Sequence, residues 1–195
     1  MIRKSWAFVF LCLWSLHAHA LDNPKKPNII FILADDLGYM DLGCYGNPYN
    51  ETPHLNKLAK GGVRFTQAYA ASTVCSPSRA AIMTGLHPAR LKLTNFLIGN
   101  RTEDDSPLLP AHWKTYLGSK EITLAQRLKA LGYQTGMIGK WHLGAAISNH
   151  PLNRGFDEFF GNLYHLNAEE EPEHPDYPKD PEFKKKFGPR GVIRS

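Results

Sequence analysis

The chain has 195 residues, of which 43% are hydrophobic and 21% are charged, and its formal net charge at pH 7 is +5. This composition is typical of a globular domain and excludes an intrinsically disordered chain. Because the positive excess is small and the basic residues are not interleaved with aromatic ones, the sequence does not indicate nucleic-acid binding.

The first twenty residues are organised like a secretory signal peptide. Arg3 and Lys4 form a basic start, an apolar stretch follows, and "AHA" at 18–20 supplies small residues for cleavage. The apolar stretch is too short to span a bilayer, and no later segment is long enough. We therefore expect a signal peptide over residues 1–20 and a product of residues 21–195 that is periplasmic or secreted, without a stable membrane anchor.

A continuous apolar, β-branched run, "NIIFIL" at 28–33, predicts a buried parallel strand. Asp35 and Asp36 follow at its carboxyl end. Open α/β sheets bind ligands beyond the carboxyl ends of their strands, and carboxylate oxygens suit a hard divalent cation. Both acids are therefore candidate metal ligands, although a solvated turn with an Asx hydrogen bond is the simpler explanation of an isolated pair.

A helix is predicted directly after Cys75, in the stretch "STVCSPSRAAIMTG". Ser76 suits the N-cap, Pro77 the first helical position and Gly85 the C-terminal stop. Unpaired N–H groups and the helix dipole favour an anion at such a terminus, and Arg79 adds a cation one turn further on. The pattern fits a site for a tetrahedral oxyanion, and a thiol nucleophile is also considered, although a Cys-His-Asn peptidase context is lacking.

Two cysteines, Cys44 and Cys75, follow the expected signal peptide. In an oxidising compartment, a disulfide between them is one interpretation. The helix start beside Cys75 favours a chemical role for this thiol instead.

Further helices and strands alternate along the chain. Periodicity and flanking Gly and Pro residues predict helices over 52–61 and 123–131, strands over 63–70 and 133–138, a strand and loop within 155–167, a loop-rich segment over 86–120, and an exposed charged loop over 168–191. Leu124, Leu128 and Leu131 share one face of the second helix. This alternation predicts the α/β fold class, with a mostly parallel sheet flanked by helices.

The stretch "GYQTGMIGKWHLG", residues 132–144, places Lys140 and His142 on the loop after an expected strand. Alternate residues of an extended loop point the same way, so both side chains can face one anion. The lysine would supply positive charge and the imidazole a transferable proton. An isolated Lys-x-His is more often a surface feature than a site.

Two of these stretches carry a resemblance to a known family. "CSPSRAAIMTG", from Cys75, resembles the C-x-P-S-R-x-x-x-x-T-G signature of the sulfatase family, and residues 132–144 resemble the second sulfatase signature. The resemblance covers most of residues 27–195 and implies the N-terminal part of an alkaline-phosphatase-like catalytic domain. It also implies a hydrolase of sulfate esters in which a maturation enzyme, reading Pro77 and Arg79, oxidises Cys75 to formylglycine.

The resemblance further implies the roles of the site residues. Asp35, Asp36 and residue 75 would bind Ca²⁺, Arg79 and Lys140 would stabilise the sulfate oxygens, and His142 would handle a proton. A later metal pair, a second sulfate-binding histidine and a later lysine of the family are missing from the sequence, so we expect a fragment or a truncated reading frame. Two alternatives stay open: a phosphate or phosphonate monoesterase of the same superfamily, and a non-catalytic remnant.

Overall fold

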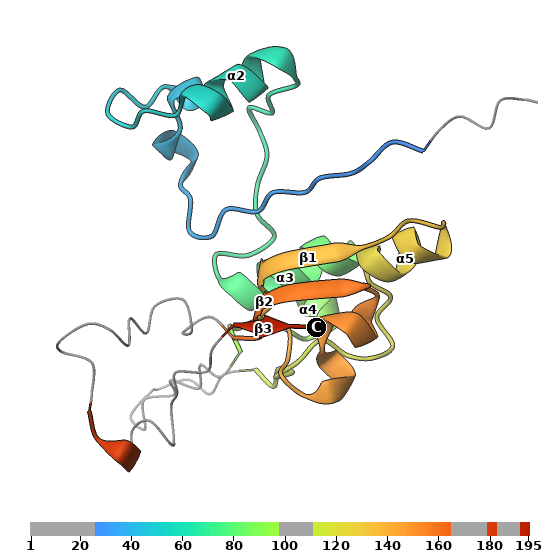
Figure 1. Cartoon of the computed structure of the whole chain (residues 1–195). Helices are drawn as coiled ribbons and strands as arrows, with labels where there is room; N and C mark the ends of the chain where they lie inside the picture. Colours follow the sequence, from blue (N-terminus) through green and yellow to red (C-terminus); the bar gives the residue numbers. More distant parts are fainter. Residues whose placement is uncertain (1–25, 98–110, 165–178, 183–191) are drawn as a thin grey trace, which may run out of the picture. The chain divides into compact units, whose positions relative to one another are not determined.

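A computed structural model describes residues 26–97, 111–164, 179–182 and 192–195 of the chain (Figure 1). Its contacts divide the chain into two compact units, residues 1–51 and 52–195, which are described separately below. The expected signal peptide and most of the charged segment 168–191 lie outside the described residues.

The first unit is described over residues 26–51. An extended stretch leads into two short 3-10 helices, η1 (Tyr39–Asp41) and η2 (Gly43–Tyr45). The predicted strand over 28–33 is wrong, because these residues form no strand and their apolar side chains are exposed, Ile30 by 86%. An apolar run becomes a strand only when a neighbouring strand completes its hydrogen bonds, and the run takes no part in the described sheet.

The described sheet of the second unit has the order β1-β2-β3 and is built from β1 (Gly136–Lys140), β2 (Glu158–Asn162) and β3 (Ile193–Arg194). β1 and β2 are parallel, with Gly139 opposite Gly161, whereas β2 and β3 are antiparallel. A Cβ atom at Gly161 would collide with the backbone oxygen of Gly139, so the close pairing requires glycine there. The α-helices that are described from end to end precede the sheet in the chain, and two short 3-10 helices lie between β1 and β2. A parallel strand pair within a small mixed sheet, together with these helices, agrees with the predicted α/β class.

β1 begins three residues later than the sequence predicts. Helix α5 (Leu124–Ala130) is followed by a C-terminal turn, in which Gly132 donates to the carbonyl of Lys129 and Tyr133 to that of Leu128. These bonds keep Tyr133 in the helix cap, so the extended backbone starts only at Gly136.

Four α-helices are described from end to end: α2 (Pro53–Gly61), α3 (Cys75–Thr84), α4 (Pro88–Leu91) and α5, together with the 3-10 turns η3 (Ile147–Asn149) and η4 (Pro151–Arg154). The predicted helices over 52–61 and 123–131 are confirmed. Thr123 and Gln126 form a capping box at the start of α5, each side chain accepting from the other's backbone N–H at 3.2 and 2.9 Å. None of the described helices has the length and hydrophobicity needed to cross a bilayer.

The predicted strand over 63–70 is not formed. These residues are irregular in the structure, and their apolar side chains face solvent, Val63 with 82% and Phe65 with 67% of its surface exposed. Alternation of apolar residues therefore does not produce a strand here, because no neighbouring strand pairs with this described segment.

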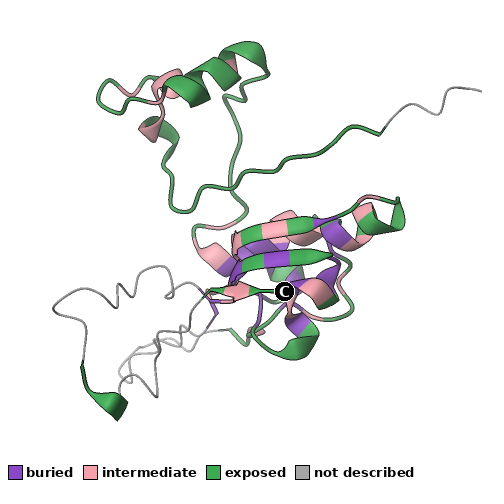
Figure 2. Cartoon of the chain, viewed as in Figure 1, coloured by how far each residue is buried: buried purple, intermediate pink, exposed green. Residues whose placement is uncertain are grey.

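Half of the buried core residues of the second unit come from residues 86–120, the segment that the sequence predicts to be loop-rich. Its buried members are Ala80, Leu91, Leu93, Leu97, Leu117, Trp141, Leu143 and Phe159. By contrast, Leu124 and Leu131 of the expected apolar face of α5 are 40% and 60% exposed, and Ala125 is buried instead. Figure 2 shows the buried residues in β2 and in the helices and loops around the sheet, whereas α2 has none. The core thus surrounds the carboxyl end of β1 and the start of α3.

Candidate active site

Cys75 is the first residue of α3 rather than the residue before it. Val74 is the N-cap, and no side chain caps this helix. The predicted Ser76 cap is therefore wrong, because the Ser76 hydroxyl accepts a hydrogen bond from the Leu97 backbone at 3.1 Å instead. Gly85 ends the helix in the left-handed conformation, as predicted. The thiol consequently lies at the N-terminal end of a ten-residue helix, where the dipole favours an anion.

Lys140 brings a cation to this helix start. It is the last residue of β1, and its Nζ atom lies 3.2 Å from the Sγ atom of Cys75. Both residues are half-buried. The structure thus joins two residues that are 65 positions apart, and an anionic group at position 75 would be stabilised from the helix and from the ammonium together.

Arg79 connects α3 to the end of β1. The residue is only 8% exposed, and its Nη1 atom donates to the backbone carbonyl of Lys140. The resemblance implied that this guanidinium would stabilise the sulfate oxygens, whereas in the structure this donor binds the protein backbone. Arg79 therefore fixes the position of Lys140, whose side chain then reaches Cys75.

His142 is held inside the second unit. It is 1% exposed, and its ring lies edge-on to Tyr164 with the centroids 5.2 Å apart. Its Nε2 atom is 3.3 Å from the backbone oxygen of Leu97, and its backbone N–H donates to Leu163 at 3.1 Å. The prediction that Lys140 and His142 point the same way assumed an extended loop, but His142 has a φ of 55°, so the alternation does not apply.

Asp35 and Asp36 lie in the first unit and are both exposed. Asp36 has a φ of 53°, in the left-handed region that few non-glycine residues adopt. Among the described non-glycine residues, only Lys92 and His142 share a positive φ with Asp36, so two of these three positions are ones that the sequence singled out. Strained backbone of this kind is concentrated at functional sites.

The two cysteines of the described chain are not joined. Cys44 and Cys75 are both half-buried, and neither forms a disulfide. The thiol of Cys75 is therefore available for other chemistry.

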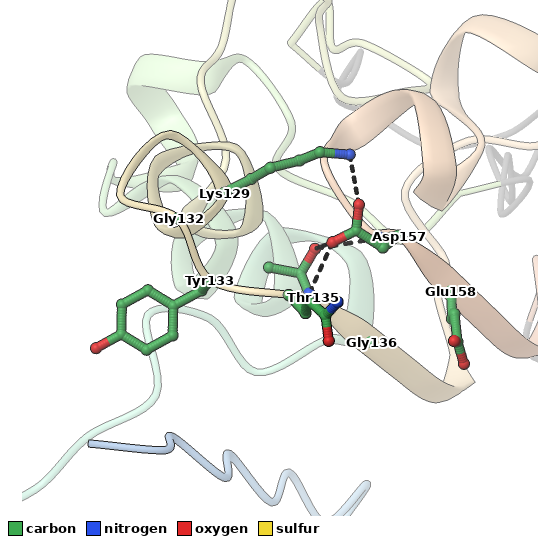
Figure 3. A pocket seen from close by; sticks show the side chains of 8 residues that line it. Lys129, Gly132, Tyr133, Thr135, Gly136, Asp157 and Glu158 are labelled. Carbon is green, nitrogen blue, oxygen red and sulfur yellow. Dashed lines mark hydrogen bonds and ion pairs between the residues drawn. The ribbon is translucent and has the colours of Figure 1, made fainter. Parts of the chain in front are cut away.

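A hollow of about 510 Å³ lies at the opposite end of β1. Its lining residues are Lys129, Gly132, Tyr133, Gln134, Thr135, Gly136, Asp157 and Glu158 (Figure 3). Asp157 accepts from Lys129 at 2.6 Å and from the backbone and hydroxyl of Thr135 at 2.8 and 3.0 Å. The Lys129 hydrogen bond, followed by those of Thr135, lowers the pKa of Asp157 to about 2. This carboxylate is therefore occupied by groups of its own chain.

Sequence reasoning missed Leu97, which frames the site, and assigned Ser76, which also frames it, a different role. Leu97 contacts both Ser76 and His142 through its backbone, and Ser76 contacts Leu97 through its hydroxyl. Backbone hydrogen bonds of an irregular segment leave no periodicity in a sequence, so no pattern could have indicated Leu97.

A family model described as "Sulfatase" matches residues 27–187. The chain is 44% identical to human steryl-sulfatase over 155 residues, which is 76% of this chain and 25% of that protein. It is 44% identical to human arylsulfatase A over 142 residues, 72% of this chain and 26% of that protein. The chain belongs to the sulfatase family, and it spans about a quarter of the length of these relatives.

Solved structures agree with this assignment. PsFucS1 sulfatase from Pseudoalteromonas sp. is similar with a TM-score of 0.68 and 30% identity, over 100% of this chain and 38% of that one. The structure of Ps i-CgsB is similar with a TM-score of 0.64 and 36% identity, over 76% of this chain and 32% of that one. The fold is therefore part of the alkaline-phosphatase-like fold of sulfatases, as the resemblance implied.

Proposed function

We propose that this chain carries the nucleophile and part of the anion-binding site of a sulfuric ester hydrolase that cleaves sulfate monoesters. The observation that supports this most directly is the Lys140 ammonium, 3.2 Å from the Cys75 sulfur at the start of α3. Membership of the sulfatase family supports the choice of sulfate over other tetrahedral anions.

Cys75 is proposed as the precursor of formylglycine, made by a formylglycine-generating maturation enzyme that recognises Pro77 and Arg79. The hydrated aldehyde supplies two hydroxyl groups on one carbon, one to attack sulfur and displace the alcohol, the other to expel sulfate as the aldehyde reforms. A serine or an unmodified cysteine lacks the second hydroxyl, so it would be a poor substitute in turnover.

The residues around position 75 have separate roles in this proposal. The start of α3 and the Lys140 ammonium stabilise negative charge on the sulfate oxygens. Arg79 holds the Lys140 backbone so that the ammonium stays beside position 75. His142 is proposed to handle the proton of the attacking or leaving oxygen.

The metal is proposed to be Ca²⁺, with Asp35, Asp36 and residue 75 among its ligands. The donor chemistry fits, because two exposed carboxylates are hard oxygen donors. Ca²⁺ takes about six to eight oxygen ligands, so further donors must complete the site. When bound, the ion would neutralise charge on the sulfate and its nucleophile.

We propose a sulfate monoester as the substrate and do not assign the alcohol part of the ester. The similar proteins include steryl-sulfatase and the rat N-acetylgalactosamine-6-sulfatase, which is 41% identical over 139 residues, and their names imply different alcohols. We further propose that residues 1–20 are a signal peptide and that residues 21–195, the N-terminal part of the catalytic domain, belong to a periplasmic or secreted protein.

Mass spectrometry and turnover together test this proposal. The native polypeptide is isolated from its host, its Cys75 peptide is analysed, and matched nitrophenyl sulfate and phosphate esters are offered as substrates. We expect an aldehyde at position 75 and faster turnover of the sulfate ester. Faster turnover of the phosphate ester would favour a phosphomonoesterase, and an unmodified thiol without turnover would indicate a non-catalytic remnant.

A further inference from the structure

Both backbone polar groups of Leu97, the N–H and the carbonyl, contact side chains of the candidate site. Its backbone N–H donates to the Ser76 hydroxyl at 3.1 Å, and its carbonyl oxygen lies 3.3 Å from Nε2 of His142. Ser76 is 0%, Leu97 3% and His142 1% exposed. A buried chain of two hydrogen bonds therefore connects the second residue of α3 to the imidazole.

The second of these bonds determines which ring nitrogen carries hydrogen. A carbonyl oxygen only accepts, so Nε2 of His142 must be the donor. In a neutral imidazole, Nδ1 is then the nitrogen with the lone pair. The tautomer of His142 thus depends on where the Leu97 carbonyl lies.

The unfavourable backbone conformation of His142 adds to its dependence on the Leu97 carbonyl. Its φ of 55° is unfavourable for a side chain with a Cβ atom, and such a conformation persists only where the surroundings hold it. The Leu97 carbonyl, the Leu163 carbonyl and the Tyr164 ring are among the contacts that hold it here.

We propose that Ser76 is a positioning residue for His142. Its hydroxyl fixes Leu97, the Leu97 carbonyl keeps hydrogen on Nε2, and Nδ1 is left as the atom that exchanges a proton. The catalytic consequence rests on the proposed sulfatase function, whereas the tautomer itself does not. The Ser76 hydroxyl acts on His142 through Leu97.

The first test is spectroscopic and uses the full native polypeptide labelled with ¹⁵N-histidine. We expect the His142 signals of the wild type to show hydrogen on Nε2, and those of Ser76→Ala to show a mixture of tautomers. Ser76→Thr, which keeps the hydroxyl, should resemble the wild type. Thr135→Ala is the control, because it removes a buried hydroxyl at the other end of β1. Hydrogen on Nδ1 in the wild type, or no change in Ser76→Ala, would overturn the proposal.

The second test is kinetic, with each rate divided by the fraction of aldehyde at position 75, since Ser76 lies inside the maturation signature. We expect kcat of Ser76→Ala to fall about 10- to 100-fold with KM nearly unchanged, and Ser76→Thr to recover most of the loss. An unchanged kcat would overturn the role of Ser76. If the wild type fails to hydrolyse sulfate esters, the proposed function fails, and the NMR result still decides the tautomer. Should Ser76→Ala not fold, Ser76→Cys, a weak acceptor of similar size, replaces it in both tests.

Discussion

The side chain and the backbone carbonyl of Lys140 interact with different residues. The ammonium lies against the Cys75 sulfur, while the carbonyl accepts from Arg79. Arg79 and Cys75 both belong to the first turn and a half of α3, so one helix fixes both ends of the same lysine. A cation placed in this way needs little reorganisation when negative charge develops beside it.

Replacing Lys140 by Ala should therefore lower kcat/KM for a sulfate ester by about 100-fold or more, because one preorganised group opposite the developing charge is lost. Steady-state kinetics of the matured protein measure this. Lys129→Ala is the matched control, since Lys129 is partly exposed at the other end of β1. A loss below threefold in Lys140→Ala would contradict the role given to the ammonium.

Asp157 connects three elements of the second unit. It lies just before β2 and accepts from Lys129 in α5 and from Thr135 just before β1. These hydrogen bonds hold the pKa of Asp157 at about 2, whereas an unfolded aspartate has a pKa of about 3.9. The folded state therefore favours the carboxylate over the protonated acid.

This difference predicts a dependence of stability on pH. The carboxylate stabilises the fold fully above the unfolded pKa, and its contribution is lost as the pH falls from about 4 to about 2. The difference in free energy of unfolding between wild type and Asp157→Asn should thus be largest at neutral pH and nearly absent near pH 2. Urea unfolding followed by circular dichroism measures it, and a difference that grows on acidification would be the contrary result.

Arg154 also connects segments of the second unit through hydrogen bonds, but its side chain is buried. It is 2% exposed and donates to the backbone carbonyls of Gly118, Ser119 and Glu121 at 3.1, 3.3 and 2.6 Å. Burial lowers the pKa of its guanidinium, and the charge of Glu121 opposes this. One planar side chain with several donors thus satisfies three carbonyls of a turn.

Arg154→Met should destabilise the protein by about 1 to 3 kcal/mol, because three partly buried carbonyls lose their charged donor. Arg154→Lys should recover part of the loss, since an ammonium cannot match the spacing of all three acceptors. Denaturant unfolding measures both variants, and exposed Arg127→Met on α5 is the control. Equal stability of Arg154→Met and the control would show that the turn over residues 118–121 is stable without the Arg154 side chain.

On the scale of the whole molecule, the described sheet leaves one face open. Ile138 and Phe160 are paired across β1 and β2, and they are 85% and 52% exposed. The chain spans about a quarter of the length of the relatives it matches, and those relatives are longer sulfatases. Tests of activity therefore belong on the polypeptide as its host produces it.

Metal removal tests the site as a whole. Treating the native protein with a chelator should abolish turnover of a sulfate ester, and added Ca²⁺ should restore it, because the carboxylates of Asp35 and Asp36 are proposed to act through an ion. Metal analysis of each sample accompanies the assay, and chelator saturated with Ca²⁺ is the control. Full activity of a sample shown to be metal-free would contradict the proposal.

The local features of this chain could be predicted from its sequence. Thr123, Gly85 and Pro53 mark helix ends through caps, backbone conformation and fixed dihedral angles that act within a few residues. The two signatures also identified the family and placed Cys75 at a helix start. Each of these inferences depends on neighbours in sequence.

Only the tertiary structure decided which apolar runs become strands and which residues frame the imidazole. Residues 28–33 and 63–70 have the composition of strands, yet a strand needs a partner whose hydrogen bonds come from elsewhere in the chain. Leu97 lies in an irregular segment, and its contacts with Ser76 and His142 join positions 21 and 45 residues apart. Such pairings depend on how distant segments pack, and local periodicity holds no record of that packing.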